Sequence, residues 1–264
     1  MGCDLTNFGL SEMLRCSRAV HQAASNAPTL EASARRICRV LYDVLETPDG
    51  DRACALVRCY KTHSYGDLPP DVQRVAWRML DDVTPPPSRM KCLTLLGTAG
   101  DEPAWNARRS SRGHQAIPLP SSQIVERAPM IAGLIKEFGV DLNDVVNPTP
   151  DVVRDLAGKT YGVFHVEDAR GSPTIPVQDE FVAKYGIRSV VGFGGSLASG
   201  DLFAVIFFAR VPVSASSADR FRAIALDVKT LFFLYNDTQV FDAEGGIDLR
   251  RAEERGGGET TAQL

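Results

Sequence analysis

The sequence predicts an α+β fold, with a central antiparallel sheet of about six strands flanked by helices on both faces. Residues 187–210 contain two strongly β-forming runs on either side of the small, turn-forming residues 198–201, as in a hairpin. The second run, 202–209, is apolar at every position, so both of its faces must be covered by other elements. Amphipathic helical patterns before and after the hairpin supply that cover.

Helices and strands alternate through the first half of the chain. Pro28 separates two helical patterns, because proline inside a helix costs about 3 kcal/mol, and Thr29 is a suitable N-cap for the second pattern. Pro69 and Pro70 precede a shorter helix. We expect helices at 11–26 and 29–46 and after Pro70, and strands at 53–60 and 92–97.

The second half of the chain contains shorter elements and a closing helix. Pro129 fits the first turn of a helix that Gly139 ends, and Gly186 is placed to end another helix in the left-handed conformation. The pattern from Ser216 to Asp219 is that of a capping box. We expect helices at 129–138, 151–156 and 178–185 and from 216 to about 232, and a strand at 161–166.

Length and composition describe an ordinary globular chain. Its 264 residues, 44% hydrophobic and 23% charged, suffice for one enlarged domain over 10–240, with an insertion over about 62–158. We expect residues 1–9 to be flexible and the polar, Gly-rich residues 241–264 to be disordered. The net charge of −4 provides no overall attraction for nucleic acid, and no apolar run approaches the ~20 residues that cross a bilayer. A cytoplasmic protein is expected.

The six cysteines all lie in the first half and show neither a C-x-x-C pair nor a zinc-binding spacing, which favours reduced, buried thiols. Residues 1–6 match the N-myristoylation pattern, with Cys3 as a second acylation position. The pattern is short, so lipidation at Gly2 or Cys3 is left open.

Three segments carry a family resemblance. Residues 164–169 (FHVEDA), 181–192 (FVAKYGIRSVVG) and 202–205 (LFAV) together resemble the second half of a GAF domain, and the likeness extends over roughly 10–235. The resemblance implies a non-catalytic sensory module, with a ligand pocket between the sheet and the inserted helices. Because the chain shows no kinase, phosphate-loop or DNA-binding signature, the signal would pass through the terminal helices to a partner protein in trans, with a homodimer expected.

Two groups of residues are candidates for contact with a small-molecule ligand. The first lies on and just after a strand of the predicted pocket and combines apolar and polar side chains, as ligand sites do: Tyr161, Phe164, His165 and Asp168. The second is the polar and aromatic group of the loop at 100–114, able to close over a carboxylate or phosphate: Trp105, Arg112 and His114. No metal site is predicted, and the ligand itself is not identified by these residues.

Three other interpretations remain open. His165 or His114 could be an axial ligand to haem, which would make the protein a gas or redox sensor. The domain could instead bind no small molecule and act as a dimerisation or adaptor module through its first and last helices. A thiol-dependent reductase of the free methionine sulfoxide type would need a reactive cysteine, but no cysteine follows Cys92, so the pocket-forming half has no thiol.

Overall fold

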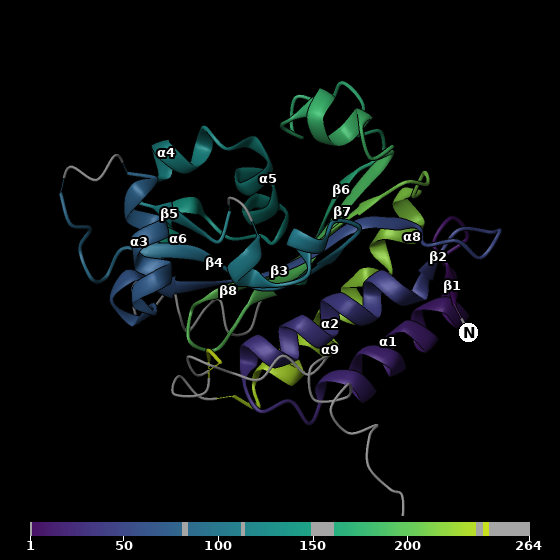
Figure 1. Cartoon of the computed structure of the whole chain (residues 1–264), viewed down its shortest axis with the longest axis horizontal. Helices are drawn as coiled ribbons and strands as arrows, with labels where there is room; N and C mark the ends of the chain where they lie inside the picture. Colours follow the sequence, from purple (N-terminus) through teal and green to yellow (C-terminus); the bar gives the residue numbers. More distant parts are fainter. Residues whose placement is uncertain (1, 81–83, 112–113, 149–160, 236–239, 243–264) are drawn as a thin grey trace, which may run out of the picture.

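The hairpin expected at 187–210 forms part of the middle of the sheet. In this computed structural model, which describes residues 2–80, 84–111, 114–148, 161–235 and 240–242, β7 (Ser189–Ser196) pairs antiparallel with β8 (Leu202–Ala209). Gly200, with φ of 81°, provides the positive φ that the connecting turn requires. The six-stranded sheet has the order β5-β4-β3-β8-β7-β6, with every neighbouring pair antiparallel (Figure 1).

The other strands extend the sheet on both sides of β8. They are β3 (Cys54–Ser64), β4 (Lys91–Gly100), β5 (Ala116–Leu119) and β6 (Tyr161–Val166). The α+β class, with one antiparallel sheet of six strands between helical layers, is therefore confirmed. β5 was not predicted, because it is short and contains Pro118. Its place at the edge of the sheet explains how the missing N–H of that proline is tolerated.

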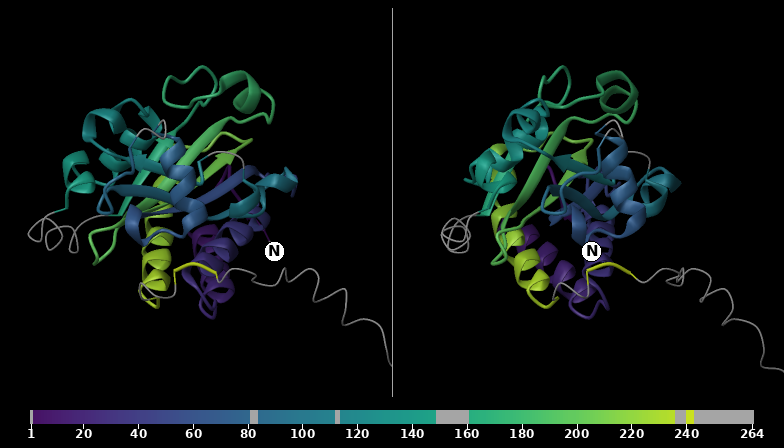
Figure 2. Two further views of the ribbon diagram at one scale, coloured as in Figure 1. Left: turned by 60° about the vertical axis from the view of Figure 1, so that its left-hand side comes forward. Right: turned by 90° about the vertical axis from the view of Figure 1, so that its left-hand side faces the viewer.

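Three long helices cover one face of the sheet (Figures 1 and 2). They are α1 (Leu10–Ala24), α2 (Leu30–Val44) and α9 (Phe221–Phe232). Thr29 caps α2 as expected, its side chain accepting a hydrogen bond from the backbone N–H of Ala32 at 3.0 Å. The apolar stripes of α2 and α9 pack on the side chains that the central strands direct to this face. The contact completely buries Ile37 and Leu41 of α2, Ile224 and Val228 of α9, and Val205 and Phe207 of β8.

The inserted segments cover the opposite face. They include α4 (Ser122–Glu126), α5 (Pro129–Glu137), α6 (Leu142–Val146) and the helical turn η4 (Gln178–Ala183), while α3 (Pro70–Arg78) lies beside β5 (Figure 2). Pro129 and Gly139 bound α5 as predicted, Gly139 having φ of 70°. Leu134, Ile135 and Phe138 bury their side chains on this face of the sheet.

Two local expectations differ from the structure. Residues 1–9 were expected to be flexible, but β1 (Cys3–Asp4) pairs with β2 (Leu45–Glu46), and Cys3, Leu5 and Phe8 are buried. These side chains fill the space at the end of the α1, α2 and α9 layer, where Phe8 stacks on Phe221 at 4.5 Å.

The expected capping box at Ser216 is also replaced. Ser214 caps α8 (Ala215–Asp219) through the N–H of Ser217, and α9 starts separately after Arg220. The helix expected at 151–156 and the tail from 243 onwards lie outside the described residues.

Candidate functional site

The space between the sheet and α5, where a ligand pocket was expected, is closed by direct packing of the helix on glycines. A Cβ atom added at Gly162 of β6 would lie 2.1 Å from the carbonyl oxygen of Glu137. Cβ atoms in proteins do not come this close to another heavy atom outside their own residue and its neighbours. On β7, a Cβ atom added at Gly192 would lie 2.6 Å from Cδ2 of Leu134. The absence of side chains at these positions lets α5 lie almost on the backbone of the sheet.

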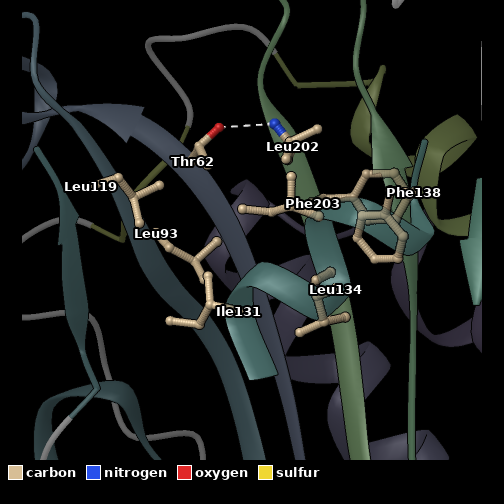
Figure 3. Close-up of a pocket in the computed structure, with 10 residues that line it drawn as sticks. Thr62, Leu93, Leu119, Ile131, Leu134, Phe138, Leu202 and Phe203 are labelled. Carbon is tan, nitrogen blue, oxygen red and sulfur yellow. Dashed lines mark hydrogen bonds between the residues drawn. The ribbon is translucent and has the colours of Figure 1, made fainter. Parts of the chain in front are cut away.

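The cavity that remains under α5 is very small. It measures about 20 Å³ and is lined by apolar side chains from α5 and three strands, including Leu93, Ile131 and Leu134, with Thr62 at its rim (Figure 3). The hydroxyl of Thr62 accepts a hydrogen bond from the N–H of Leu202 at 2.8 Å, so it is not free for a ligand. The volume accommodates about one water molecule, far below the ~300 Å³ typical of small-molecule sites.

The structure does not bring the first group of candidate residues together. Phe164 faces α5, under Gly133, and contributes to filling the expected pocket. Tyr161 and His165 project to the opposite face, as alternation along a strand requires. There the ring of Tyr161 lies 5.1 Å from the Lys229 ammonium, and Nε2 of His165 is 2.8 Å from the carbonyl oxygen of Val213. Asp168 is exposed and accepts the N–H of Arg170 in a turn.

The second group lies along the loop that follows β4. Trp105 is half-buried and packs against Tyr185 at 4.7 Å, and its carbonyl accepts the Thr98 hydroxyl proton at 2.8 Å. His114 has φ of 56°, a left-handed conformation uncommon outside glycine. Although His114 is exposed overall, partial burial of its ring and the positive charge of Arg58 lower its pKa. Arg112 lies outside the described residues.

Arg58, a residue that the sequence analysis did not select, lies buried near this loop. It is 8% exposed and sits on β3 directly opposite Thr98 of β4 and Ile206 of β8. Its guanidinium donates to the hydroxyl oxygens of Tyr60 at 3.2 Å and Ser111 at 3.1 Å. The signal in the sequence was a single charged residue inside the otherwise apolar strand 53–60, where arginine is rarely buried without a partner.

An open depression, here called the arginine hollow, adjoins the same loop. Its volume is about 400 Å³, within the range of ligand sites. The residues that line it come from α3 and the loop: Asp71, Arg74, Val75, Arg78, Arg109 and Gln115. Arg74, Arg78 and Arg109 are exposed, and within the described part of the chain none of their guanidinium groups has an ion-pair or hydrogen-bond partner. The hollow therefore presents positive charge to an incoming ligand.

An ion-pair network with a buried centre at Arg108 and Glu31 connects the arginine hollow to the helical layer. Arg108, whose side chain is 2% exposed, donates to Asp71 of the hollow at 3.4 Å and to Glu31 of α2 at 3.0 Å. Glu31 also accepts the backbone N–H of Asp242 at 3.1 Å, and Asp242 pairs with Arg35 at 2.8 Å. These contacts link Asp71 to the first turn of α2 and to residues 240–242.

A second buried charged cluster lies at the turn between β7 and β8. Asp201 accepts from the ammonium groups of Lys61 at 2.8 Å and Lys91 at 2.9 Å, and its carboxylate also receives the hydroxyl protons of Thr62 and Ser199. Burial alone would raise the pKa of Asp201, but the two lysines outweigh it and lower the pKa to about 2. The cluster fixes the turn and leaves no free carboxylate for chemistry.

The cysteines are poorly suited to catalysis. All six are free and buried, and burial raises the pKa of Cys54 and of Cys92 to about 12, so the reactive thiolate is scarce at neutral pH. Among the described residues, no cluster of three potential metal ligands occurs. Within the same residues, no helix combines the length and hydrophobicity that a bilayer crossing needs.

The fold is an α+β domain, in which one antiparallel sheet separates a layer of terminal helices from a layer of shorter helical segments. No family model matches the sequence, and a search of curated proteins finds no significant match.

Solved structures with a similar arrangement include the GAF domain of the Acinetobacter phosphoenolpyruvate-protein phosphotransferase, at 12% identity and a TM-score of 0.42, covering 84% of this chain and 93% of that one. A phycocyanobilin-bound GAF domain of a cyanobacterial phytochrome is similar at 11% identity and a TM-score of 0.38, covering 83% and 93%. The N-acylhomoserine-lactone-dependent LuxR-family transcription factor CepR2 of Burkholderia cenocepacia is similar at 14% identity and a TM-score of 0.36, covering 88% of this chain and 99% of that one. At these values the similarity concerns the arrangement of the chain only.

Proposed function

We propose that this chain is a non-catalytic regulatory module that binds a negatively charged small molecule in the arginine hollow and signals to a partner protein. The observation that supports this proposal is the coincidence of a ligand-sized volume with three guanidinium groups that have no partner among the described residues. Guanidinium groups bind carboxylates and phosphates through paired hydrogen bonds, so an anion would satisfy them. The closed space under α5 offers no comparable volume.

The buried network gives the proposed signal a physical route. An anion in the hollow would lie beside the Asp71 carboxylate and repel it, and Asp71 is the outer partner of Arg108. Arg108 holds Glu31, which in turn holds the backbone at Asp242. Ligand binding would therefore shift the contacts between α2 and residues 240–242, on the side of the sheet where α1 and α9 would face the proposed partner.

The test is thermal unfolding at constant ionic strength with pyrophosphate, citrate and AMP as separate probes. At least one probe is expected to raise the Tm of the protein in a saturable manner, because a ligand that binds only the folded state stabilises it. The double variant Arg74→Ala/Arg109→Ala should lose most of that shift. Arg127→Ala, which removes an exposed arginine outside the hollow, should keep it. An equal response in all three proteins, or no response to any probe, would refute the proposal.

A second candidate function is homodimerisation through the terminal helices. It is favoured by large apolar side chains that α1, α9 and the two residues beyond α9 leave exposed: Leu10, Leu14, Leu226, Phe233 and Leu234. Sedimentation velocity should show a concentration-dependent dimer that Leu14→Glu with Phe233→Glu converts to monomer. A monomer at all concentrations in the unmodified protein would exclude this function.

A further inference from the structure

Arg58 is a buried positive charge without a negative partner among the described residues. Its two terminal nitrogens donate to the neutral hydroxyls of Tyr60 and Ser111, and its Nε is buried with no hydrogen-bond partner among those residues. Ser111 is fully buried and Tyr60 is 5% exposed, so water does not readily complete the shell. Nine-tenths of Arg58 is itself out of contact with solvent.

Arg108 shows how the same fold compensates the charge of another buried arginine. It is buried to a similar extent, but two carboxylates face it, Glu31 at 3.0 Å and Asp71 at 3.4 Å. Removing a charge from water is costly unless an opposite charge compensates it, and neutral hydroxyls compensate it only in part. Arg58 therefore carries a desolvation cost that its described neighbours do not offset, which is common for groups retained to bind a ligand.

The hydrogen-bond pattern around Arg58 specifies what would offset that cost. Each hydroxyl uses its oxygen to accept from the guanidinium and keeps its own proton available as a donor. The Nε–H, the Tyr60 hydroxyl and the Ser111 hydroxyl are then three donors around one positive charge. Such a set suits a carboxylate or phosphate group, whose oxygens accept several charge-assisted hydrogen bonds.

We propose that Arg58, Tyr60 and Ser111 form a buried binding site for an oxyanion, either a carboxylate or a phosphate group. The site rests on the proposed ligand-binding role of the domain but not on the arginine hollow. The two are close, since the side-chain amide of Gln115 in the hollow donates to the carbonyl oxygen of Ser111 at 2.7 Å. Because the site is buried, the anion loses most of its water when bound, and its interaction with Arg58 is stronger than at the surface.

Thermal unfolding with inorganic phosphate and with acetate, each against chloride at equal ionic strength, tests this site. The protein should show a Tm that rises with the concentration of at least one of the two oxyanions. Arg58→Met keeps the aliphatic volume and removes the charge, and it should weaken the apparent affinity at least 10-fold. A shift with phosphate alone identifies a phosphate site, and a shift with acetate alone identifies a carboxylate site.

Two further sets of variants keep the test decisive. Tyr60→Phe and Ser111→Ala each remove one hydroxyl and little else, and each should weaken the affinity at least 3-fold even if Arg58→Met folds poorly. The hollow variant Arg74→Ala/Arg109→Ala should retain the response, so failure of the hollow and failure of this site are distinguishable. An unchanged response in both hydroxyl variants, or no oxyanion effect beyond that of chloride in the unmodified protein, would overturn the inference.

Discussion

Replacing Asp201 by asparagine should strongly destabilise the protein, because it leaves two buried lysines without their counter-charge. The ammonium groups of Lys61 and Lys91 lie 2.8 and 2.9 Å from the Asp201 carboxylate, and their side chains are only 7% and 13% exposed. Breaking a buried ion pair by removing one partner typically costs about 3 to 5 kcal/mol. We expect Asp201→Asn to lose an amount in this range.

The same carboxylate should make the stability depend on pH in a defined window. Its pKa is about 2 in the folded protein and about 3.9 in an unfolded chain. Because the folded-state pKa is the lower one, the unfolded state binds the proton more readily, and the stabilisation is present above about pH 4. It is lost as the pH falls from about 4 towards 2, and amounts to about 2 to 3 kcal/mol.

Urea unfolding between pH 6 and pH 2 measures both effects. His63 lies beside Lys61 and has its own pH dependence, so the comparison is made in a His63→Phe background with and without Asp201→Asn. The matched control is Asp219→Asn, an exposed carboxylate paired with Arg222, which should cost no more than about 1 kcal/mol. The reasoning fails if Asp201→Asn costs as little as this control. It also fails if the His63→Phe protein loses the same stability between pH 4 and 2 with and without Asp201→Asn.

Three other outcomes are expected. Desolvation by burial, assisted by Lys61, lowers the pKa of His63 to about 3, and neither ring nitrogen has a hydrogen-bond partner among the described residues. His63→Phe should therefore remove the loss of stability that accompanies a fall in pH from about 6.5 to 4, above the range in which Asp201 titrates, and an unchanged profile of urea midpoints would contradict this. Gly162→Ala should cost about 3 kcal/mol in urea unfolding, because its Cβ would overlap the Glu137 carbonyl, and a cost below about 1 kcal/mol would show that α5 moves freely off the sheet. The six buried thiols should react with a thiol-specific disulfide reagent only slowly in the folded protein and completely after unfolding, so rapid reaction of Cys92 would revive the reductase interpretation.

The fold could be predicted from the sequence largely because its central elements have strong local patterns. The uniformly apolar run of β8 required cover on both faces, and Thr29, Gly139 and Gly186 marked helix boundaries through capping and positive φ. The short edge strand β5 and the burial of Cys3, Leu5 and Phe8 were missed, since neither has a periodic pattern and both depend on contacts with distant segments.

The candidate site could be predicted only in part. Strand alternation alone would have placed Phe164 and His165 on opposite faces, but the sequence did not show which face the insertion covers. The sequence also could not show that glycines at positions 162 and 192 let α5 close the expected pocket. Arg58 was visible as a charge in an apolar strand, yet its lack of a carboxylate partner depends on the tertiary structure.

The strand order has a consequence for how the domain assembles. Strands β3 to β5 and strands β6 to β8 are each local in sequence, and the two triplets meet only where β3 lies against β8, for example at Lys61 and Phe203. Pairing of β3 with β8 closes a loop of well over a hundred residues, so the formation of this strand pair should limit the folding rate. Arg58 and Ile206 face each other across this strand pair, so an anion bound at Arg58 would lie beside the place where the chain brings the two halves of the sheet together.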